Sequence, residues 1–90
     1  MKNKVLIKLI VPELDNSFDV FIPTNELVWK VKKMVLKSIS DLTGCNLNNG
    51  REYVLINKYT NQIYLNNVTI YNSDIRNASE LILMSVKNYN

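Results

Sequence analysis

Residue types that carry enzyme chemistry are sparse in this 90-residue chain. It contains no histidine, so its single cysteine, Cys45, has no imidazole to activate it as a nucleophile. The eight acidic residues are scattered singly, and no pair has the spacing of a shared acid–base site. No metal-ligand cluster and no phosphate-binding glycine loop can be recognised in the sequence. We therefore expect a protein that is not an enzyme and that needs no metal or cofactor.

The composition predicts one small globular domain. Hydrophobic residues make up 47% and charged residues 21%, and one cysteine suits a reducing compartment. No apolar stretch reaches the ~20 residues that a membrane span needs. We expect a cytoplasmic protein without membrane insertion, with a single domain over residues 1–86 and a frayed tail over residues 87–90. The net charge of +3 is low for a nucleic-acid binder, so we do not expect nucleic acid as a partner.

One long amphipathic helix is expected between Pro23 and Gly44. A step of about 100° per residue gathers its apolar residues on one stripe, and Gly44 supplies the left-handed residue that ends such a helix. Thr24 or Asn25 can cap the first free amides, and Glu26 falls in the first turn, where the helix dipole favours an anion. The buried stripe is expected to consist of Val28, Val31, Val35, Ile39 and Leu42.

Short strands precede and follow this helix. Apolar and polar residues alternate in several segments, which is the pattern of strands with one buried face. A hairpin, a crossing helix and further strands imply an α+β fold, in which a mixed sheet of four to five strands packs on one helix. The expected strands span residues 4–11, 17–22, 52–57, 62–65 and 80–86, with a turn within residues 68–76.

Two segments resemble ubiquitin. The strand from Phe18 to Ile22 followed by Pro23 looks like ubiquitin's second strand and its proline-bearing helix entry. The segment from residue 70 to residue 83 looks like ubiquitin's closing segment, with a polar turn, an isoleucine, a polar loop and a leucine-alternating strand. The resemblance implies the ubiquitin-like β-grasp fold. It places Ile70, Ile75, Leu81 and Leu83 at core positions.

Among β-grasp proteins, the chain is similar to the small bacterial YukD/EsaB-like group associated with type VII (ESX-type) secretion. The likeness spans residues 4–86 and includes the second strand and the helix opening from Leu27 to Val31. One departure is the turn before the last strand, where family members often have Asn-Gly-Asp and this chain has Asn77-Ala78-Ser79. The resemblance implies a cytoplasmic accessory or regulatory component that binds a protein of the secretion machinery.

Conjugation and sulfur transfer by ubiquitin-like proteins need a C-terminal glycine pair, because any side chain would block the narrow enzyme channel. The only glycines are Gly44 and Gly50, and the sequence ends Lys-Asn-Tyr-Asn, without a Gly-Gly tail. We therefore expect a non-conjugating protein that acts through protein–protein interaction.

An apolar patch on the outer face of the sheet is the first candidate binding site. If Val54 and Ile56 face the core, their neighbours in that strand point outward and join residues of the first and last strands. An exposed apolar cluster on a small domain marks a protein-contact site, although a strand read one residue out of register would remove it. Self-association through the patch is an alternative to a secretion partner. The expected contact residues are Leu6, Tyr53, Leu55, Ile82 and Met84.

A second candidate surface lies on the exposed side of the helix, flanked by Leu36. Its tryptophan is either the margin of the core or a contact residue, and its lysines are either a solvated face or a basic surface. The basic surface supports an alternative function as a small nucleic-acid-linked regulator, whose binding would weaken steeply with salt. The residues of this surface are Trp29, Lys30, Lys33 and Lys37.

Overall fold

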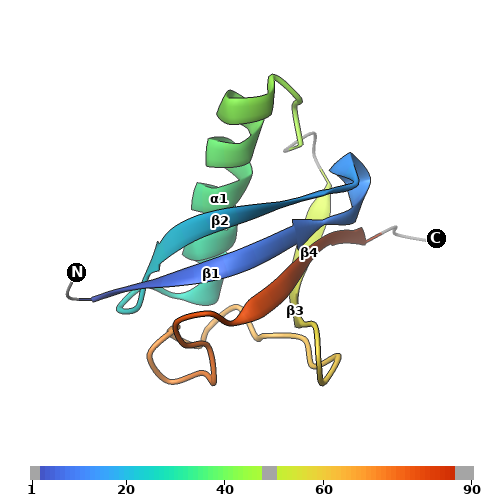
Figure 1. The fold of residues 1–90 in the computed structure, drawn as a ribbon. Coiled ribbons are helices and arrows are strands. Elements are labelled where there is room, and N and C mark those ends of the chain that lie inside the picture. The colour runs from blue at the N-terminus through green and yellow to red at the C-terminus, as the bar shows by residue number, and fades with distance from the viewer. Residues whose placement is uncertain (1–2, 48–50, 87–90) are drawn as a thin grey trace.

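The computed structural model describes residues 3–47 and 51–86. Four strands form one mixed sheet in the order β2-β1-β4-β3, and one helix crosses one face of it (Figure 1). β1 and β2 form an antiparallel hairpin, β4 runs parallel to β1, and β3 runs antiparallel to β4. The α+β arrangement predicted from the sequence is confirmed. Its elements are β1 (Lys4–Val11), the 3-10 helix η1 (Pro12–Leu14), β2 (Asn16–Pro23), α1 (Val28–Thr43), β3 (Glu52–Asn57) and β4 (Glu80–Val86).

The hydrophobic core lies between α1 and the inner face of the sheet. The odd-numbered residues of β1 face inward, as the alternation of its side chains predicts. The irregular segment between β3 and β4 also contributes to the core, because two of its isoleucines are almost completely buried. All four core positions implied by the ubiquitin resemblance are buried, namely Ile70, Ile75, Leu81 and Leu83.

The predicted strand over residues 62–65 is wrong. Ile63 forms only an isolated bridge with Ile56, and the Tyr64 N–H donates a hydrogen bond to the Leu55 carbonyl at 2.9 Å. The chain then turns away from the sheet instead of continuing along β3, so the described residues form four strands. Two backbone hydrogen bonds to β3 hold this segment in place, the second from the Asn57 N–H to the Gln62 carbonyl at 2.9 Å, together with the buried side chain of Tyr64.

Helix α1 begins later than predicted, because the segment before β4 supplies its cap. Leu27 is the N-cap residue and makes no side-chain capping bond. The Val28 N–H donates to the Val68 carbonyl at 2.9 Å, and the Trp29 N–H donates to the Asn66 carbonyl at 3.2 Å. Backbone carbonyls distant in sequence thus satisfy amides that a capping side chain usually serves. Thr24, Asn25 and Glu26 all precede the helix.

The buried stripe of α1 differs from the prediction at its C-terminal end. Leu36 is 5% exposed and Leu42 is 75% exposed. The Leu47 N–H donates to Ser40 Oγ at 3.1 Å, so the segment after the helix folds back along the side on which Leu36 lies one turn earlier. The last turns of α1 extend beyond the strands (Figure 1), and Leu42 belongs to the last of these turns. Gly44 ends the helix with φ 74°, as expected.

Candidate functional site

The face of the sheet turned away from α1 is the candidate site. Since side chains alternate along a strand, the even-numbered residues of β1 and β4 point outward. Leu6 and Met84 are 40% and 41% exposed, and Ile82 is half-buried between its neighbours. Three of the predicted contact residues therefore lie on this face.

The predicted placement of Tyr53 and Leu55 on this face is wrong, because both belong to the core, with exposed fractions of 3% and 1%. Pairing with β4 sets the register of β3 and places Leu55 opposite the buried Leu83. Val54 and Ile56 take the outward positions instead. All four residues from position 53 to 56 are apolar, so their pattern alone does not distinguish the two faces. The apolar patch observed on the outer face consists of Ile10, Val54, Ile56, Ile82 and Met84.

Four charged side chains, which we call the charged row, cross the outer face beside this patch. Asp19 of β2 pairs with Lys8 of β1, and Lys8 pairs with Glu80 of β4. Lys58, just beyond β3, continues the row, with its Nζ 3.1 Å from Glu80 Oε1. The signs alternate across the sheet from β2 to β3. The charged row was not predicted from the sequence, although the outward placement of Asp19 and Lys8 follows from strand alternation.

Glu80 is the most heavily bonded member of the charged row. The Tyr59 hydroxyl donates a hydrogen bond to Glu80 Oε2, and Lys58 donates to Oε1. These two bonds, together with the nearby charges of Lys58 and Lys8, hold the pKa of the Glu80 carboxyl below its ordinary value. The same carboxylate raises the pKa of Lys58 and of Tyr59. These shifts favour the charged forms of Glu80 and Lys58 near neutral pH.

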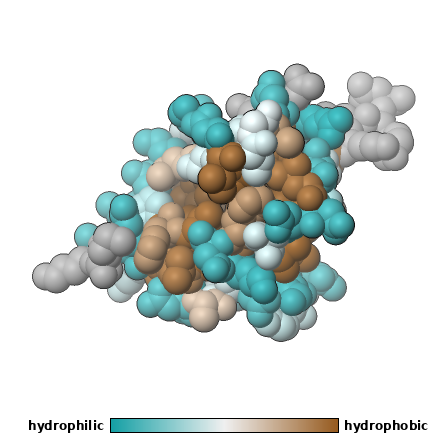
Figure 2. Space-filling view, turned by 45° about the horizontal axis from the view of Figure 1, so that its top comes forward, coloured by the Kyte–Doolittle hydropathy of each residue, from teal (hydrophilic) through white to brown (hydrophobic). Residues whose placement is uncertain are grey.

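The charged row separates the apolar patch from a smaller apolar area. Phe21 and Leu6 are cross-strand partners on the other side of the row, and Phe21 is 55% exposed. Figure 2 shows a face of the molecule on which hydrophobic surface is divided into areas by hydrophilic side chains. A surface of this kind, with apolar areas bordered by fixed charges, suits a protein partner more than a small ligand.

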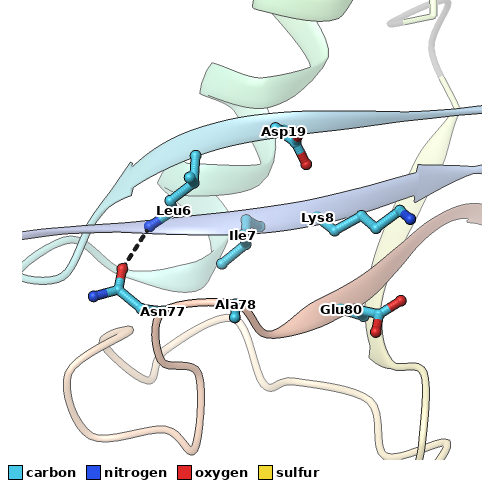
Figure 3. A pocket seen from close by; sticks show the side chains of 7 residues that line it. All are labelled: Leu6, Ile7, Lys8, Asp19, Asn77, Ala78 and Glu80. Atoms are coloured by element: carbon cyan, nitrogen blue, oxygen red, sulfur yellow. Dashed lines mark hydrogen bonds between the residues drawn. The ribbon is translucent and has the colours of Figure 1, made fainter.

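A groove of about 500 Å³ opens beside the charged row, where β1 and the segment leading into β4 run next to each other (Figure 3). The Leu6 N–H donates to Asn77 Oδ1 at 2.9 Å, and the Ala78 N–H donates to the Leu6 carbonyl at 2.8 Å. The Asn77-Ala78-Ser79 segment, which departs from the pattern of the resembled family, thus closes one side of the groove. The lining residues are Leu6, Ile7, Lys8, Asp19, Asn77, Ala78 and Glu80.

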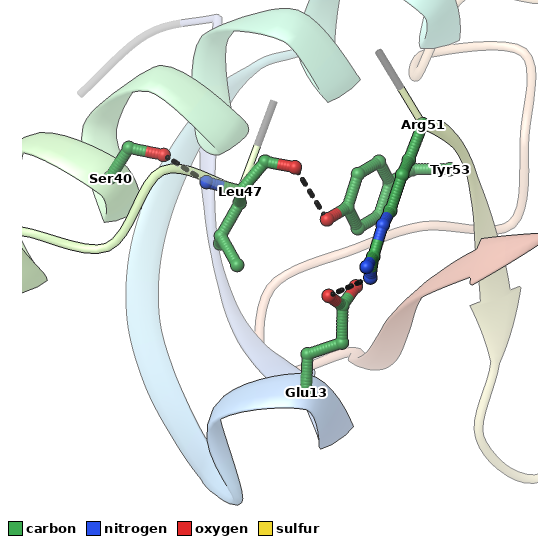
Figure 4. Close-up of polar contacts among 5 residues, drawn as sticks. All are labelled: Glu13, Ser40, Leu47, Arg51 and Tyr53. Atoms are coloured by element: carbon green, nitrogen blue, oxygen red, sulfur yellow. Dashed lines mark hydrogen bonds and ion pairs between the residues drawn. The ribbon is translucent and has the colours of Figure 1, made fainter. Parts of the chain in front are cut away.

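Tyr53 belongs to a polar cluster on the helix side of β3 (Figure 4). Its hydroxyl donates to the Leu47 carbonyl at 2.6 Å, and Arg51 pairs with Glu13 of η1 at 2.9 Å. Burial first, and then the Glu13 carboxylate, raises the pKa of Tyr53 to about 12. Tyr64 also titrates late, because burial and a 2.6 Å bond from its hydroxyl to Asp74 raise its pKa to about 12.

These two tyrosines predict a loss of stability in alkali. The folded state keeps both phenolic protons above the ordinary pKa of 10.0, at which the unfolded chain releases them. Their contribution to the free energy of unfolding is therefore complete below about pH 10 and falls as the pH rises from 10 to 12. Denaturant unfolding measured across this window should show a declining midpoint, and Tyr64→Phe should make the decline shallower. A midpoint independent of pH from 10 to 12 would contradict this assignment.

The second predicted surface, on α1, is only partly as expected. Trp29 is 40% exposed, and the Nζ atoms of Lys30 and Lys33 lie 5.8 Å from its ring centre. Two of the three lysines lie near carboxylates, since Lys30 is 3.9 Å from Glu26 and Lys37 is 3.3 Å from Asp41. Leu36, expected to flank this surface, is buried instead. The partial neutralisation of its charge makes this surface a weaker candidate than the sheet face.

Lys32 is a lysine that sequence reasoning did not single out. Its Nζ donates to the Tyr53 carbonyl at 2.9 Å, on the edge strand β3. Burial lowers the pKa of Lys32, and Glu52 opposes that shift. A lysine bonded to an edge carbonyl occupies a group that would otherwise be available to pair with another strand.

The described residues were also searched for a metal-binding cluster and for a membrane-spanning helix. Across residues 3–47 and 51–86, no group of three or more histidine, cysteine, aspartate or glutamate side chains is placed to hold a metal ion. In the same part of the chain, no helix is long and apolar enough to cross a membrane.

The comparison with known proteins defines the fold class. Neither a protein-family model nor a curated protein sequence matches the chain. It superposes on a chain of the MycP5-free ESX-5 inner membrane complex with a TM-score of 0.79 at 15% identity, covering 98% of this chain and 22% of that one. It also matches the EccD5 ubiquitin-like domain from Mycobacterium xenopi with a TM-score of 0.71 at 11% identity, covering 96% and 98%.

A third match is the C-terminal ubiquitin-like domain of human 2'-5'-oligoadenylate synthetase-like protein, with a TM-score of 0.69 at 18% identity, covering 100% and 92%. The fold is therefore the ubiquitin-like β-grasp, as the sequence resemblance implied. The chain spans only about a fifth of the length of the ESX-5 chain that it matches.

Proposed function

We propose that this protein is a non-catalytic, non-conjugating ubiquitin-like component of a bacterial type VII secretion system, of the YukD/EsaB-like kind, with an accessory or regulatory role. It acts on the cytoplasmic side by docking the outer sheet face onto a protein of the secretion machinery. The observation that carries the proposal is the apolar patch beside the charged row, on a domain whose fold matches a chain of an ESX-5 inner membrane complex.

The outer sheet face has the composition expected of a docking surface. Ile10, Ile82 and Ile56 follow one another across three adjacent strands, and Met84 and Val54 lie beside them. Contiguous apolar side chains that are partly exposed on a small domain favour association with another protein, because binding removes their remaining surface from water. The neighbouring charges supply orientation and specificity more than affinity.

The proposal is tested with an Ile82→Asp/Met84→Asp variant in a pull-down from cells that encode the chain, with captured proteins identified by mass spectrometry. We expect the wild type to retain components of the secretion membrane complex and the variant to lose them, because two buried carboxylates at the interface would each lack a partner. Circular dichroism of the variant is the check that it remains folded. A wild type that captures no secretion component would overturn the secretion assignment.

A triple variant of the helix surface, Lys30→Ala/Lys33→Ala/Lys37→Ala, is the matched control. It leaves the sheet face intact, so it should capture the same proteins as the wild type. Loss of capture in this variant alone would move the site to α1. Recovery of nucleic acid only, with binding that weakens steeply as salt rises, would favour the nucleic-acid-linked alternative.

A further inference from the structure

The charged row is self-complementary. From β2 to β3 its members are Asp19, Lys8, Glu80 and Lys58, so the signs run negative, positive, negative, positive. Consider two copies stacked with their outer sheet faces together. A two-fold axis that lies between the two sheets, and runs parallel to the strands at the position between β1 and β4, reverses this order in the second copy. Asp19 then faces the partner subunit's Lys58, and Lys8 faces the partner subunit's Glu80. Every charge in the row meets an opposite charge.

The charges of the row are available for such contacts. Among residues 3–47 and 51–86, neither Lys8 nor Asp19 takes part in an ion pair within the chain. Glu80 is already bonded to Lys58 and Tyr59, but a carboxylate accepts about four hydrogen bonds and an ammonium donates three. Asp19 and Lys8 of one copy, which form no ion pair within the described residues of their own chain, would therefore lie over the partner subunit's Lys58 and the partner subunit's Glu80, which pair with each other.

The same axis also brings apolar side chains of the two copies together, although it places Ile56 over the partner subunit's Ser17. It places β1 over the partner's β4, so that Ile10 faces the partner subunit's Ile82, and isoleucine meets isoleucine on both sides of the axis. An axis that crosses the strands at the level of the charged row would instead place each member of the row over its own copy, and like charges in close contact are repelled. Where the two rows face each other, the charges therefore favour the axis along the strands.

We propose that a second copy of this chain docks on the outer sheet face, with the two sheets stacked about a two-fold axis along the strands. The inference rests on the proposed function of that face as a contact site and names an occupant for it. Four strands about 4.8 Å apart and roughly 20 Å long offer on the order of 400 Å² each, well below the ~800 Å² per partner of a stable complex. The dimer is therefore weak, and it competes with the secretion partner for the same face.

Charge reversal at one position of each facing pair tests the dimer. Lys8→Glu places two carboxylates opposite each other on both sides of the axis, and Glu80→Lys places two ammonium groups there. Each variant alone should bind itself at least about tenfold more weakly than the wild type does. An equimolar mixture of the two should associate again, because each new charge then faces an opposite charge on the other chain. Lys33→Glu and Asp41→Lys, on α1, change the net charge equally and should leave self-association unchanged.

Sedimentation equilibrium of the full chain, from ~10 µM to ~1 mM, measures self-association of the wild type, the four variants and the mixture. The salt concentration is kept low because salt screens surface charges. A wild type that stays monomeric throughout, or a mixture that stays monomeric while the wild type dimerises, overturns the proposal. The two proposals fail separately. Capture of secretion components by a strictly monomeric wild type would sustain the proposed function alone, and a restored mixture without such capture would sustain the dimer alone.

Discussion

Leu55→Asp is expected to unfold the domain, whereas Ile56→Asp, one residue later, leaves it folded. Leu55 is 1% exposed and faces α1, so the substitution removes a buried side chain and places a carboxylate without a partner in the core. The lost packing alone costs about 2–5 kcal/mol, and the buried charge adds several more. A domain of this size is stabilised by roughly 5–15 kcal/mol, so most or all of its stability is lost.

The adjacent variant is the matched control for Leu55→Asp. Ile56 points to the outer face and is only partly buried, so Ile56→Asp should cost about 1–2 kcal/mol and lower the melting temperature by roughly 5–15 °C. Thermal unfolding followed by circular dichroism measures both variants. If Ile56→Asp proved the more damaging of the two, the register of β3 described above would be wrong.

Ile70→Ala is expected to destabilise the protein by about 2–5 kcal/mol, although Ile70 lies in no helix or strand. Its side chain is completely buried, and its N–H donates to the Glu26 carbonyl at 3.1 Å, just before α1. Truncation would leave a cavity beneath the segment that caps the helix. Because Val68 and Asn66 of that segment accept the first helix amides, the loss should extend to the start of α1.

Tyr71→Ala provides the comparison for Ile70→Ala, since Tyr71 is the next residue and is mostly exposed. Its replacement should change the free energy of unfolding by no more than about 0.5 kcal/mol. Urea denaturation gives the free energy for both variants, and hydrogen exchange of the Val28 and Trp29 amides reports on the helix start. Equal stability of the two variants would show that this segment does not support the core.

The fold could be predicted from the sequence wherever one side of an element differs in polarity from the other. Lys8 marks the outer face of β1, and the lysines of α1 mark its solvent side, so both elements were oriented correctly. The ends of α1 could not be predicted in the same way. Its first amides bond to Asn66 and Val68, which are about forty residues away in the sequence, and such tertiary contacts override local capping preferences.

The candidate site was predicted only in part, for the same physical reason. Lys8 marks the outer face of β1, which carries Leu6, and the ubiquitin resemblance placed Leu81 and Leu83 in the core and so turned Ile82 and Met84 outward. β3 is apolar at four consecutive positions, so only its pairing with β4 reveals that Tyr53 and Leu55 are inside. The charged row escaped prediction because its members come from four separate segments, and their adjacency depends on the order of strands in the sheet.

The parallel pair at the centre of the sheet also determines when the chain is able to fold. β1 and β4 are joined by the pairs Lys8–Glu80, Leu9–Leu81 and Ile10–Ile82, so partners in the middle of the sheet are separated by about seventy positions of sequence. During synthesis, the β1–β2 hairpin and α1 are made before β4. Until that strand is complete, one edge of β1 and the apolar side of α1 lack their cover. The nascent chain therefore exposes a surface during translation that the finished domain conceals, and such surfaces are the ones that chaperones bind and that aggregation exploits.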